Sequence, residues 1–151
     1  MQYFEDLEIG TVKRFGSYAV TREEVIAFAS RYDPQPFHLD DEAAAQTFFG
    51  KVAASGWHTG AMFMAMMVEE MKRVGHQGMG SPGLDGLTWH KPVYPGDTLS
   101  CEQEIVEKTR SKSRPGMGIF KSRIRVLNQH GEAVMSFLST AFIAVREPDK
   151  A

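Results

Sequence analysis

The chain has 151 residues, a length that suits one domain whose core can form without disulfides. Its formal charge of −2, with 24% charged residues, gives no indication of a nucleic-acid partner. The single cysteine, Cys101, excludes an intramolecular disulfide framework and has no CxxC partner for zinc, so we expect a small buried strand residue in a reducing compartment.

The N-terminal segment MQYFEDLEIGTVKRFG carries acidic residues where a signal peptide would have a basic region followed by an apolar run. The longest apolar run, Ala61 to Val68, is too short to cross a bilayer. We therefore expect a cytoplasmic protein without a membrane partner.

Residues 11–20 follow a turn at Ile9-Gly10 and can form an extended strand. Thr21 and Glu24 then have the spacing of a capping box, which predicts a short helix that ends near Tyr32. The end of this helix delivers Asp33 to the next loop.

The segment DPQPFH, Asp33 to His38, cannot be helical because Pro34 and Pro36 lack backbone donors and bias the preceding residues toward extended geometry. A carboxylate and an imidazole on so stiff a loop form a candidate acid–base pair for one small substrate. The structural alternative is that Asp33 finishes the helix and His38 is a partly buried structural residue.

Two further helices are predicted. Asp40 or Asp41 can cap a helix over residues 42–48, with Gly50 as its stop. The next helix, about His58 to Val74, is apolar on every side in its first half, which predicts that it is buried and wrapped by a broad element. Its methionines are expected to pack in the core rather than form a soft ligand surface or a metal site.

From Leu84 onward the hydrophobic period changes to two, which predicts half-buried strands. Turn residues at 94–97 and 128–131 predict that successive strands are antiparallel neighbours. The last run, Ala133 to Val145, is apolar on both faces, as in a central strand covered on both sides. The sequence thus predicts an α+β fold with an antiparallel sheet curled round a long buried helix.

Nearly the whole chain, as a single domain over residues 1–151, resembles the MaoC-like dehydratase family, which includes R-specific enoyl-CoA hydratases and has the hot-dog fold. The segments that carry the resemblance are Phe28 to Asp40 (FASRYDPQPFHLD, similar to the pattern D-x-N-P-x-H-x-D), Phe49-Gly50, Ala53 to Gly56, and Lys91 to Asp97 (KPVYPGD).

The resemblance places Asp33 and His38 on the two catalytic positions, and Gly56 on the glycine whose N–H holds the thioester carbonyl. The chain departs from the pattern at three positions: Gln35 replaces Asn, Ser55 replaces a histidine, and Met64 stands where some members place a serine near the aspartate. Gln35, Ser55 and the neighbouring Trp57 are counted as candidate substrate-binding residues.

The activity implied by the resemblance is reversible hydration of a 2-enoyl-CoA to an (R)-3-hydroxyacyl-CoA, with coenzyme A entering only as part of the substrate and with no other cofactor. No metal is expected, because His90 and His130 have no metal partner at recognisable spacing. His58, beside Trp57 at the entry to the long helix, is expected to be a structural cap, with a place in the acyl pocket as the alternative. Two alternatives stay open. One is a hot-dog thioesterase, whose carboxylate would normally lie on the long helix, where Glu69 and Glu70 come late. The other is a non-catalytic acyl-CoA-binding module.

A basic loop lies between two predicted strands and contains Arg110, Lys112 and Arg114. It is either a solvated hairpin or a clamp for the phosphates of coenzyme A, which need cations at the mouth of a tunnel. The resemblance also implies a homodimer, or a dimer of dimers, with each tunnel along a subunit boundary.

Overall fold

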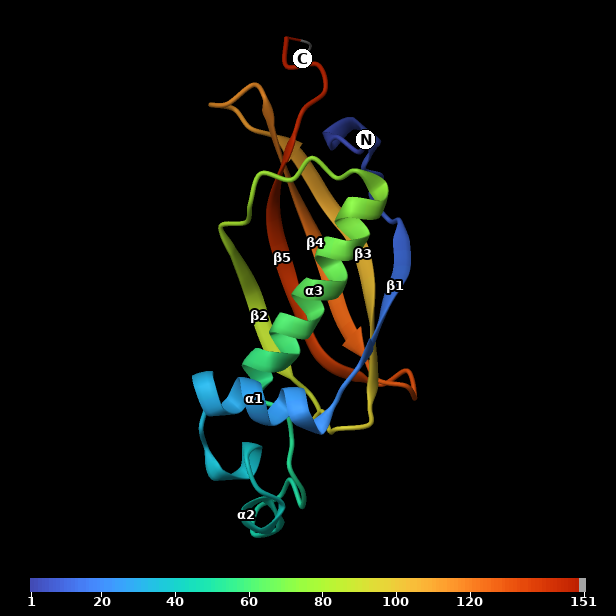
Figure 1. Cartoon of the computed structure of the whole chain (residues 1–151). Coiled ribbons are helices and arrows are strands. Elements are labelled where there is room, and N and C mark those ends of the chain that lie inside the picture. Colours follow the sequence, from blue (N-terminus) through green and yellow to red (C-terminus); the bar gives the residue numbers. More distant parts are fainter. Residues whose placement is uncertain (150–151) are drawn as a thin grey trace.

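The computed structural model describes residues 1–149. Five strands form one antiparallel sheet in the order β1-β3-β4-β5-β2, and the long helix α3 crosses one face of it (Figure 1). This arrangement confirms the predicted α+β class. The elements are β1 Val12–Ala19, α1 Arg22–Tyr32, α2 Asp41–Ala45, α3 Gly56–Val74, β2 Gly83–Trp89, β3 Thr98–Arg110, β4 Met117–Leu127 and β5 Ala133–Ala144, with 3-10 turns at Phe4–Asp6 and Pro36–His38.

The first two helices begin where their caps predict. The Thr21 hydroxyl accepts from the Glu24 N–H at 3.2 Å, and the Asp40 carboxylate accepts from the Ala43 N–H at 3.1 Å. However, α2 ends at Ala45 rather than at Phe48. The hydroxyl of Thr47 donates back to the carbonyl of Ala44 at 2.7 Å, and this local bond competes with another helical turn.

Helix α3 begins at Gly56, two residues earlier than predicted, because Ser55 is its N-cap. The sheet packs on α3 as predicted, but it covers one side only, so the first half of the helix is not buried all round in the single chain. A sheet covers one side of a helix, and residues three and four positions apart share the other side. This exposed apolar stripe is formed by Ala61, Met64, Ala65 and Val68.

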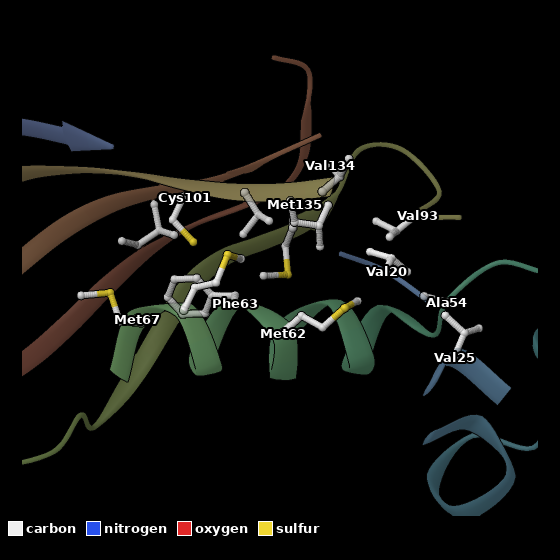
Figure 2. Close-up of a cluster of buried hydrophobic side chains, with 14 of the residues drawn as sticks. Val20, Val25, Ala54, Met62, Phe63, Met67, Val93, Cys101, Val134 and Met135 are labelled. Atoms are coloured by element: carbon white, nitrogen blue, oxygen red, sulfur yellow. The ribbon is translucent and has the colours of Figure 1, made fainter. Parts of the chain in front are cut away.

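The main hydrophobic core lies between α3 and the sheet (Figure 2). Met62, Phe63 and Met67 on the helix belong to the same cluster as Cys101 and Met135 on the sheet. Burial raises the pKa of the Cys101 thiol to about 12, so this cysteine is a structural core residue, as predicted.

Strand β1 approaches α3 closely at Gly16, where the register with β3 shifts. Gly16 has φ +83°, and a Cβ at this position would lie 2.6 Å from the Sδ of Met66. Only glycine combines this backbone geometry with such a close approach.

The connection from β2 to β3 contradicts one prediction. The 94–97 turn is present, since the Asp97 carboxylate accepts from the Tyr94 N–H at 2.9 Å, but β2 and β3 are not neighbours. Residues 90–97 instead carry the chain past the ends of β5 and β4, and the turn docks on Val20 at the end of β1. Turn residues specify a reversal of direction but not the partner strand. The 128–131 turn does join antiparallel neighbours, β4 and β5.

β5 lies inside the sheet between β4 and β2, as predicted, although Leu138 and Phe142 on its outer side are only half-buried. β2 is an edge strand, which explains why Leu84 and Trp89 are exposed rather than half-buried.

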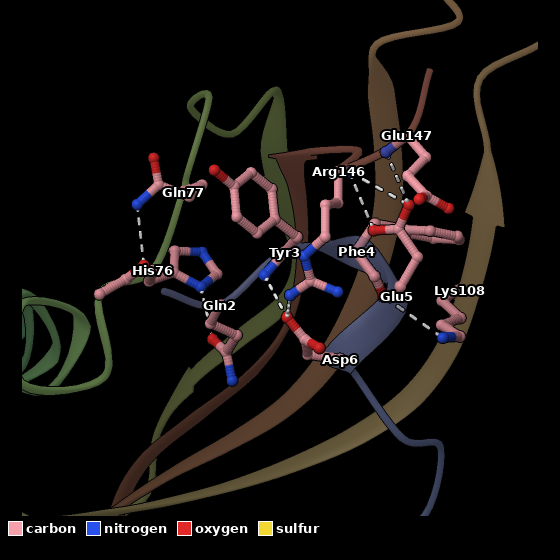
Figure 3. Close-up of polar contacts among 11 residues, drawn as sticks. Gln2, Tyr3, Phe4, Glu5, Asp6, His76, Gln77, Lys108, Arg146 and Glu147 are labelled. Carbon is pink, nitrogen blue, oxygen red and sulfur yellow. Dashed lines mark hydrogen bonds and ion pairs between the residues drawn. The ribbon is translucent and has the colours of Figure 1, made fainter. Parts of the chain in front are cut away.

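The N-terminal segment packs on the end of the sheet that lies away from α1 (Figure 1), and Figure 3 shows its polar contacts. Gln2 bonds the ring of His76 just after α3 at 2.8 Å, and the Glu5 carboxylate accepts from the Arg146 N–H. Phe4 belongs to a second, smaller core cluster beneath this segment. In residues 1–149, no helix is both long and apolar enough to span a membrane.

Glu70 ties α3 to β1. Its carboxylate accepts from Arg73 at 2.6 Å and from Lys13 on β1 at 3.2 Å. The bond from Arg73, together with that from Lys13, outweighs the opposing effect of burial and lowers the pKa of Glu70 from 4.5 to about 2.

We expect Glu70→Gln to lower the free energy of unfolding at neutral pH by about 1–3 kcal/mol. Because the folded-state pKa is depressed, this contribution is present above the ordinary pKa near 4.5 and is lost as the pH falls toward 2. Urea unfolding of both proteins across this range measures it. Glu69→Gln, one residue away and exposed, is the control and should change little. A difference that persisted at pH 2 would contradict the assignment.

Candidate functional site

Asp33 and His38 come together at the end of α1. The N–H of Asp33 still bonds the Ala29 carbonyl at 2.9 Å, and Pro34 then forces the chain out of the helix. The turn at Pro36–His38 brings the imidazole back, so that His38 Nε2 lies 3.4 Å from Asp33 Oδ2. His38 is buried and Asp33 is half-buried.

The orientation of the His38 ring is determined by its other nitrogen. Nδ1 lies 2.6 Å from the Ala53 carbonyl, and since a carbonyl can only accept, Nδ1 carries a proton. In the neutral ring Nε2 is therefore an acceptor, and it faces the carboxylate of Asp33, which is also an acceptor. Two such groups at 3.4 Å need a hydrogen between them, either a proton on Nε2 or a water molecule that donates to both.

The carboxylate of Asp33 has two donors of its own. Gln35 Nε2 donates to Oδ1 at 2.7 Å, and the Ser55 hydroxyl donates to Oδ2 at 2.7 Å. Partial burial alone would raise the pKa of Asp33, but these two bonds and the charge of His38 together hold that pKa below its ordinary value. Asp33 is therefore ionised at neutral pH.

Ser55 has no exposed surface. Its hydroxyl accepts from the N–H of Trp57 at 3.3 Å as the N-cap of α3 while it donates to Asp33. Gln35 and Ser55, which were predicted as substrate contacts, instead hydrogen-bond the Asp33 carboxylate. Met64 does not support the Asp33 carboxylate, because its side chain lies in the exposed apolar stripe of α3.

Gly56 is the first residue of α3, so its N–H has no acceptor within the helix and lies at the positive end of the helix dipole. The indole of Trp89 donates to the Gly56 carbonyl at 3.0 Å, and a Cβ on Gly56 would lie 2.5 Å from that ring. Trp57 is exposed and meets Trp89 edge to face at 5.2 Å. No local sequence pattern pointed to Trp89 as a site residue, because it lies on a strand distant in the chain.

A groove of about 790 Å³ runs along α3 from Gly56 and Trp57 to Gln2 and Lys13 at the other end of the sheet. Its lining is mainly apolar. Asp33 and His38 are not among the lining residues, so the pair lies just beyond the Gly56 end of the groove.

The basic loop lies at the other end of the molecule from Asp33 (Figure 1). It joins β3, which ends at Arg110, to β4, and the 13 residues of β3 span about 40 Å. Arg110 donates to the carbonyls of Pro115 and Pro148, while Lys112 and Arg114 are exposed. One chain therefore does not bring this loop to its own Asp33–His38 pair.

His58 forms a separate polar cluster. Its Nε2 lies 3.3 Å from the Glu24 carboxylate, which also accepts from the Tyr18 hydroxyl, and its ring stacks on Phe28 at 4.6 Å. Burial lowers the pKa of His58 despite the opposing effect of Glu24. His58 is neither a cap nor a residue of the large groove; it braces α1 against α3.

Across residues 1–149, no three histidine, cysteine or acidic side chains are grouped to hold a metal.

Comparisons with known proteins agree with one another. The family model described as MaoC like domain matches residues 6–123. The uncharacterised protein YdeM of Bacillus subtilis is 30% identical over 83% of this chain and 86% of its own length. The (R)-specific enoyl-CoA hydratase of Aeromonas caviae is 29% identical over 72% of this chain and 78% of its own. A solved MaoC-like dehydratase of Rhodospirillum rubrum is 37% identical with a TM-score of 0.88, over 97% of this chain and 99% of that one.

We expect Ser55→Ala and Gln35→Ala each to raise the pKa of Asp33 toward its ordinary value, because each removes a hydrogen bond to the ionised carboxylate. Titration of the carboxyl carbon by NMR measures this shift. Ser55→Ala also removes the α3 cap and should cost about 1 kcal/mol of stability. Gln35 is exposed, so its variant separates the electrostatic effect from the loss of stability. Unchanged titration in both variants would refute the assigned contacts.

Proposed function

Because the chain belongs to the MaoC-like dehydratase family, we propose that it catalyses the reversible addition of water to a 2-enoyl-CoA, giving an (R)-3-hydroxyacyl-CoA. The observation that carries this proposal is the pair of facing acceptors, His38 Nε2 and Asp33 Oδ2, at 3.4 Å beside the first turn of α3. The named activity of the Aeromonas caviae relative supports the choice of reaction and of stereochemistry.

The pair holds the reacting water. When the His38 ring is neutral, it and the ionised Asp33 both accept, so one water donates a hydrogen bond to each and its oxygen lone pairs turn toward the substrate. As the oxygen bonds to Cβ, one member of the pair takes the water proton. A proton passes from the pair to Cα, which leaves both residues in their starting states. Water is added in full and no electrons are transferred, so no cofactor is required beyond the coenzyme A of the substrate.

Gly56 stabilises the charge that develops on the thioester oxygen. Its N–H has no acceptor in the helix and sits where the dipole of α3 favours negative charge. A donor of this kind, aimed at a developing oxyanion, contributes about 10²- to 10³-fold in rate. Glycine is required because the ring of Trp89 already occupies the space of a Cβ.

The thioesterase alternative has less support. Glu69 and Glu70 begin 13 residues beyond Gly56, which is about 20 Å along the helix. Glu70 is also fully engaged with Arg73 and Lys13. A binding module needs no facing acid–base pair, so the geometry of Asp33 and His38 argues against it.

A homodimer completes the proposed site. The exposed apolar stripe of α3 and the free edge of β2 lie on the two sides of the groove. Antiparallel pairing of two β2 edges sets the two α3 helices side by side and brings the basic loop of one subunit to the end of the sheet that holds Asp33 of the other. The phosphates of coenzyme A then meet Lys112 and Arg114 from the partner.

We place the reaction in the cytoplasm, in keeping with a single reduced cysteine.

A single spectrophotometric assay distinguishes the three reaction classes. A short 2-enoyl-CoA should lose the ultraviolet absorbance of its conjugated double bond without releasing thiol, because water adds at Cβ and the thioester survives. The reverse reaction should occur from the (R)-3-hydroxyacyl-CoA and not from the S isomer. A thioesterase would release thiol instead, and a binding module would only raise the melting temperature with ligand. Thiol release with the double bond intact would overturn the proposal.

The acid–base pair is tested in the same assay. Asp33→Asn and His38→Ala should each lower kcat by at least about 10²-fold, and the double variant should lose little more because both act on one water. His130→Ala changes the same residue type as His38 at an exposed turn and should leave kcat unchanged. Activity near normal in either site variant would assign the pair to a structural role.

The basic loop is tested with Lys112→Ala/Arg114→Ala, which leaves Arg110 and its hydrogen bonds in place. KM for CoA thioesters should rise several-fold at low ionic strength and approach the parent value as salt is added, while kcat changes little. Mixed dimers with an Asp33→Asn chain then show which subunit the loop serves. In such a dimer one chain has Asp33 and the altered loop, and the other carries Asp33→Asn and an intact loop. If the loop serves the partner subunit, the one working site then shows the parent KM. Failure to recover it would refute the shared site.

A further inference from the structure

A row of polar side chains crosses the inner face of the sheet, within an otherwise apolar groove. Lys13 on β1 is the register partner of Gln103 on β3, and Ser122 on β4 is the register partner of Ser139 on β5. Gln103 Nε2 donates to the Ser122 hydroxyl at 3.0 Å, which joins the two halves. All four residues line the groove, and we call them the polar row.

The polar row separates the two hydrophobic clusters. On each of the three central strands, consecutive inward-facing residues run from the main cluster, through one member of the row, to residues packed in the smaller cluster. These triplets are Cys101, Gln103, Ile105 on β3; Ile124, Ser122, Phe120 on β4; and Phe137, Ser139, Ala141 on β5. Ser122 and Ser139 lie at one level, whereas Gln103 is level with Ile124, two residues nearer the main cluster, and its side chain spans this step to Ser122. Polar residues at adjoining inward positions of all three strands are a feature of the groove.

The burial of this row is costly for the fold. Gln103 is 6% exposed and Ser122 is 1% exposed. A glutamine amide can donate two hydrogen bonds and accept two, yet within residues 1–149 the Gln103 side chain makes a single one, to Ser122. A buried amide left partly unpaired is unfavourable compared with an aliphatic residue of the same size. In residues 1–149 the buried side-chain atom left without a partner is His58 Nδ1 and not an atom of Gln103, so the unpaired amide atoms of Gln103 reach the groove. Their partners come from what occupies the groove, either water or a ligand.

The position of the row can be measured along β5. Met135 is the register partner of Trp89, whose indole bonds the Gly56 carbonyl, and Ser139 lies four residues beyond Met135. Four strand residues span about 13 Å. Between these levels the groove is apolar, lined by Phe63, Met67, Leu87 and Phe137. A chain that starts at Gly56 thus crosses an apolar stretch before it meets the row.

We propose that the polar row recognises an uncharged oxygen function, such as a hydroxyl or keto group, on the distal part of a medium-length acyl chain. This rests on the proposed function, since it takes Gly56 as the point where the thioester is held. The group is uncharged because Lys13, the cation of the row, is already paired with Glu70 at 3.2 Å. A carboxylate buried beside Gln103 and Ser122 would lack a counter-charge of its own.

The test compares two ligands that differ only at the far end. A separation of about 13 Å corresponds to a chain of about ten carbons, so the probes are saturated decanoyl-CoA and its ω-hydroxy counterpart. Calorimetry should show about tenfold tighter binding of the hydroxy ligand to the parent protein. Gln103→Met should lose this preference by weakening hydroxy binding while decanoyl-CoA binds as well or better. Ser122→Ala, a smaller change, should reduce the preference in the same direction.

Thr140→Val is the matched control, because Thr140 follows Ser139 on the same strand and faces the opposite side. It should leave both affinities unchanged. If Gln103→Met and Ser122→Ala changed the affinities for both ligands equally, the proposal would be overturned, and the polar row would be assigned to binding water. A preference for an ω-carboxyl over an ω-hydroxyl ligand would overturn the uncharged assignment. Calorimetry needs no turnover, and hydration of crotonyl-CoA, which is too short to reach the row, reports separately on the proposed reaction.

Discussion

The candidate site depends on one hydroxyl, that of Ser55, which joins the end of α1 to the start of α3. It donates to the Asp33 carboxylate and accepts from the first turn of α3, so the acid and the helix that carries Gly56 are held as one unit. Since Ser55 is fully buried, neither bond competes with bulk water. The stack of His58 on Phe28 and the contact of His58 with Glu24 brace the same helix pair farther along α1. The geometry at Asp33 is therefore set by how these two helices pack, and not by the loop alone.

One chain presents only part of what a thioester of coenzyme A requires. The reacting groups lie at the α1 end, and the exposed cations lie at the end of the β3–β4 hairpin. The groove runs along α3 between these two ends, but neither the Asp33–His38 pair nor these cations line it. The proposed homodimer would cover two features that are liabilities in a lone subunit, namely the apolar stripe around Met64 and the unpaired edge of β2.

Much of the fold and the site could be predicted from the sequence because the signals are local. The caps at Thr21 and Asp40, the proline-bounded loop from Asp33 to His38 and the period-two strands each depend on residues close together in the chain. What could not be predicted depends on distant partners. The neighbour of β2, the ring of Trp89 over Gly56 and the hydroxyl of Ser55 on Asp33 are each set by tertiary packing. The apolar character of α3 indicated burial, but it could not distinguish a covering sheet from a covering subunit.

The crossing from β2 to β3 also has a consequence for the order in which the sheet forms. β3, β4 and β5 are joined by short hairpins and make contacts that are local in sequence. β2 pairs with β5 at a sequence separation of some fifty residues, and β1 pairs with β3 at a separation of nearly ninety. Each of these two strands therefore has to close a large loop before its hydrogen bonds can form. The three-stranded meander is thus the natural folding nucleus, with the two flanks added afterward. In an isolated subunit the edge strand β2 is then also the first part of the sheet to open, and its amide hydrogens are the first there to exchange with solvent.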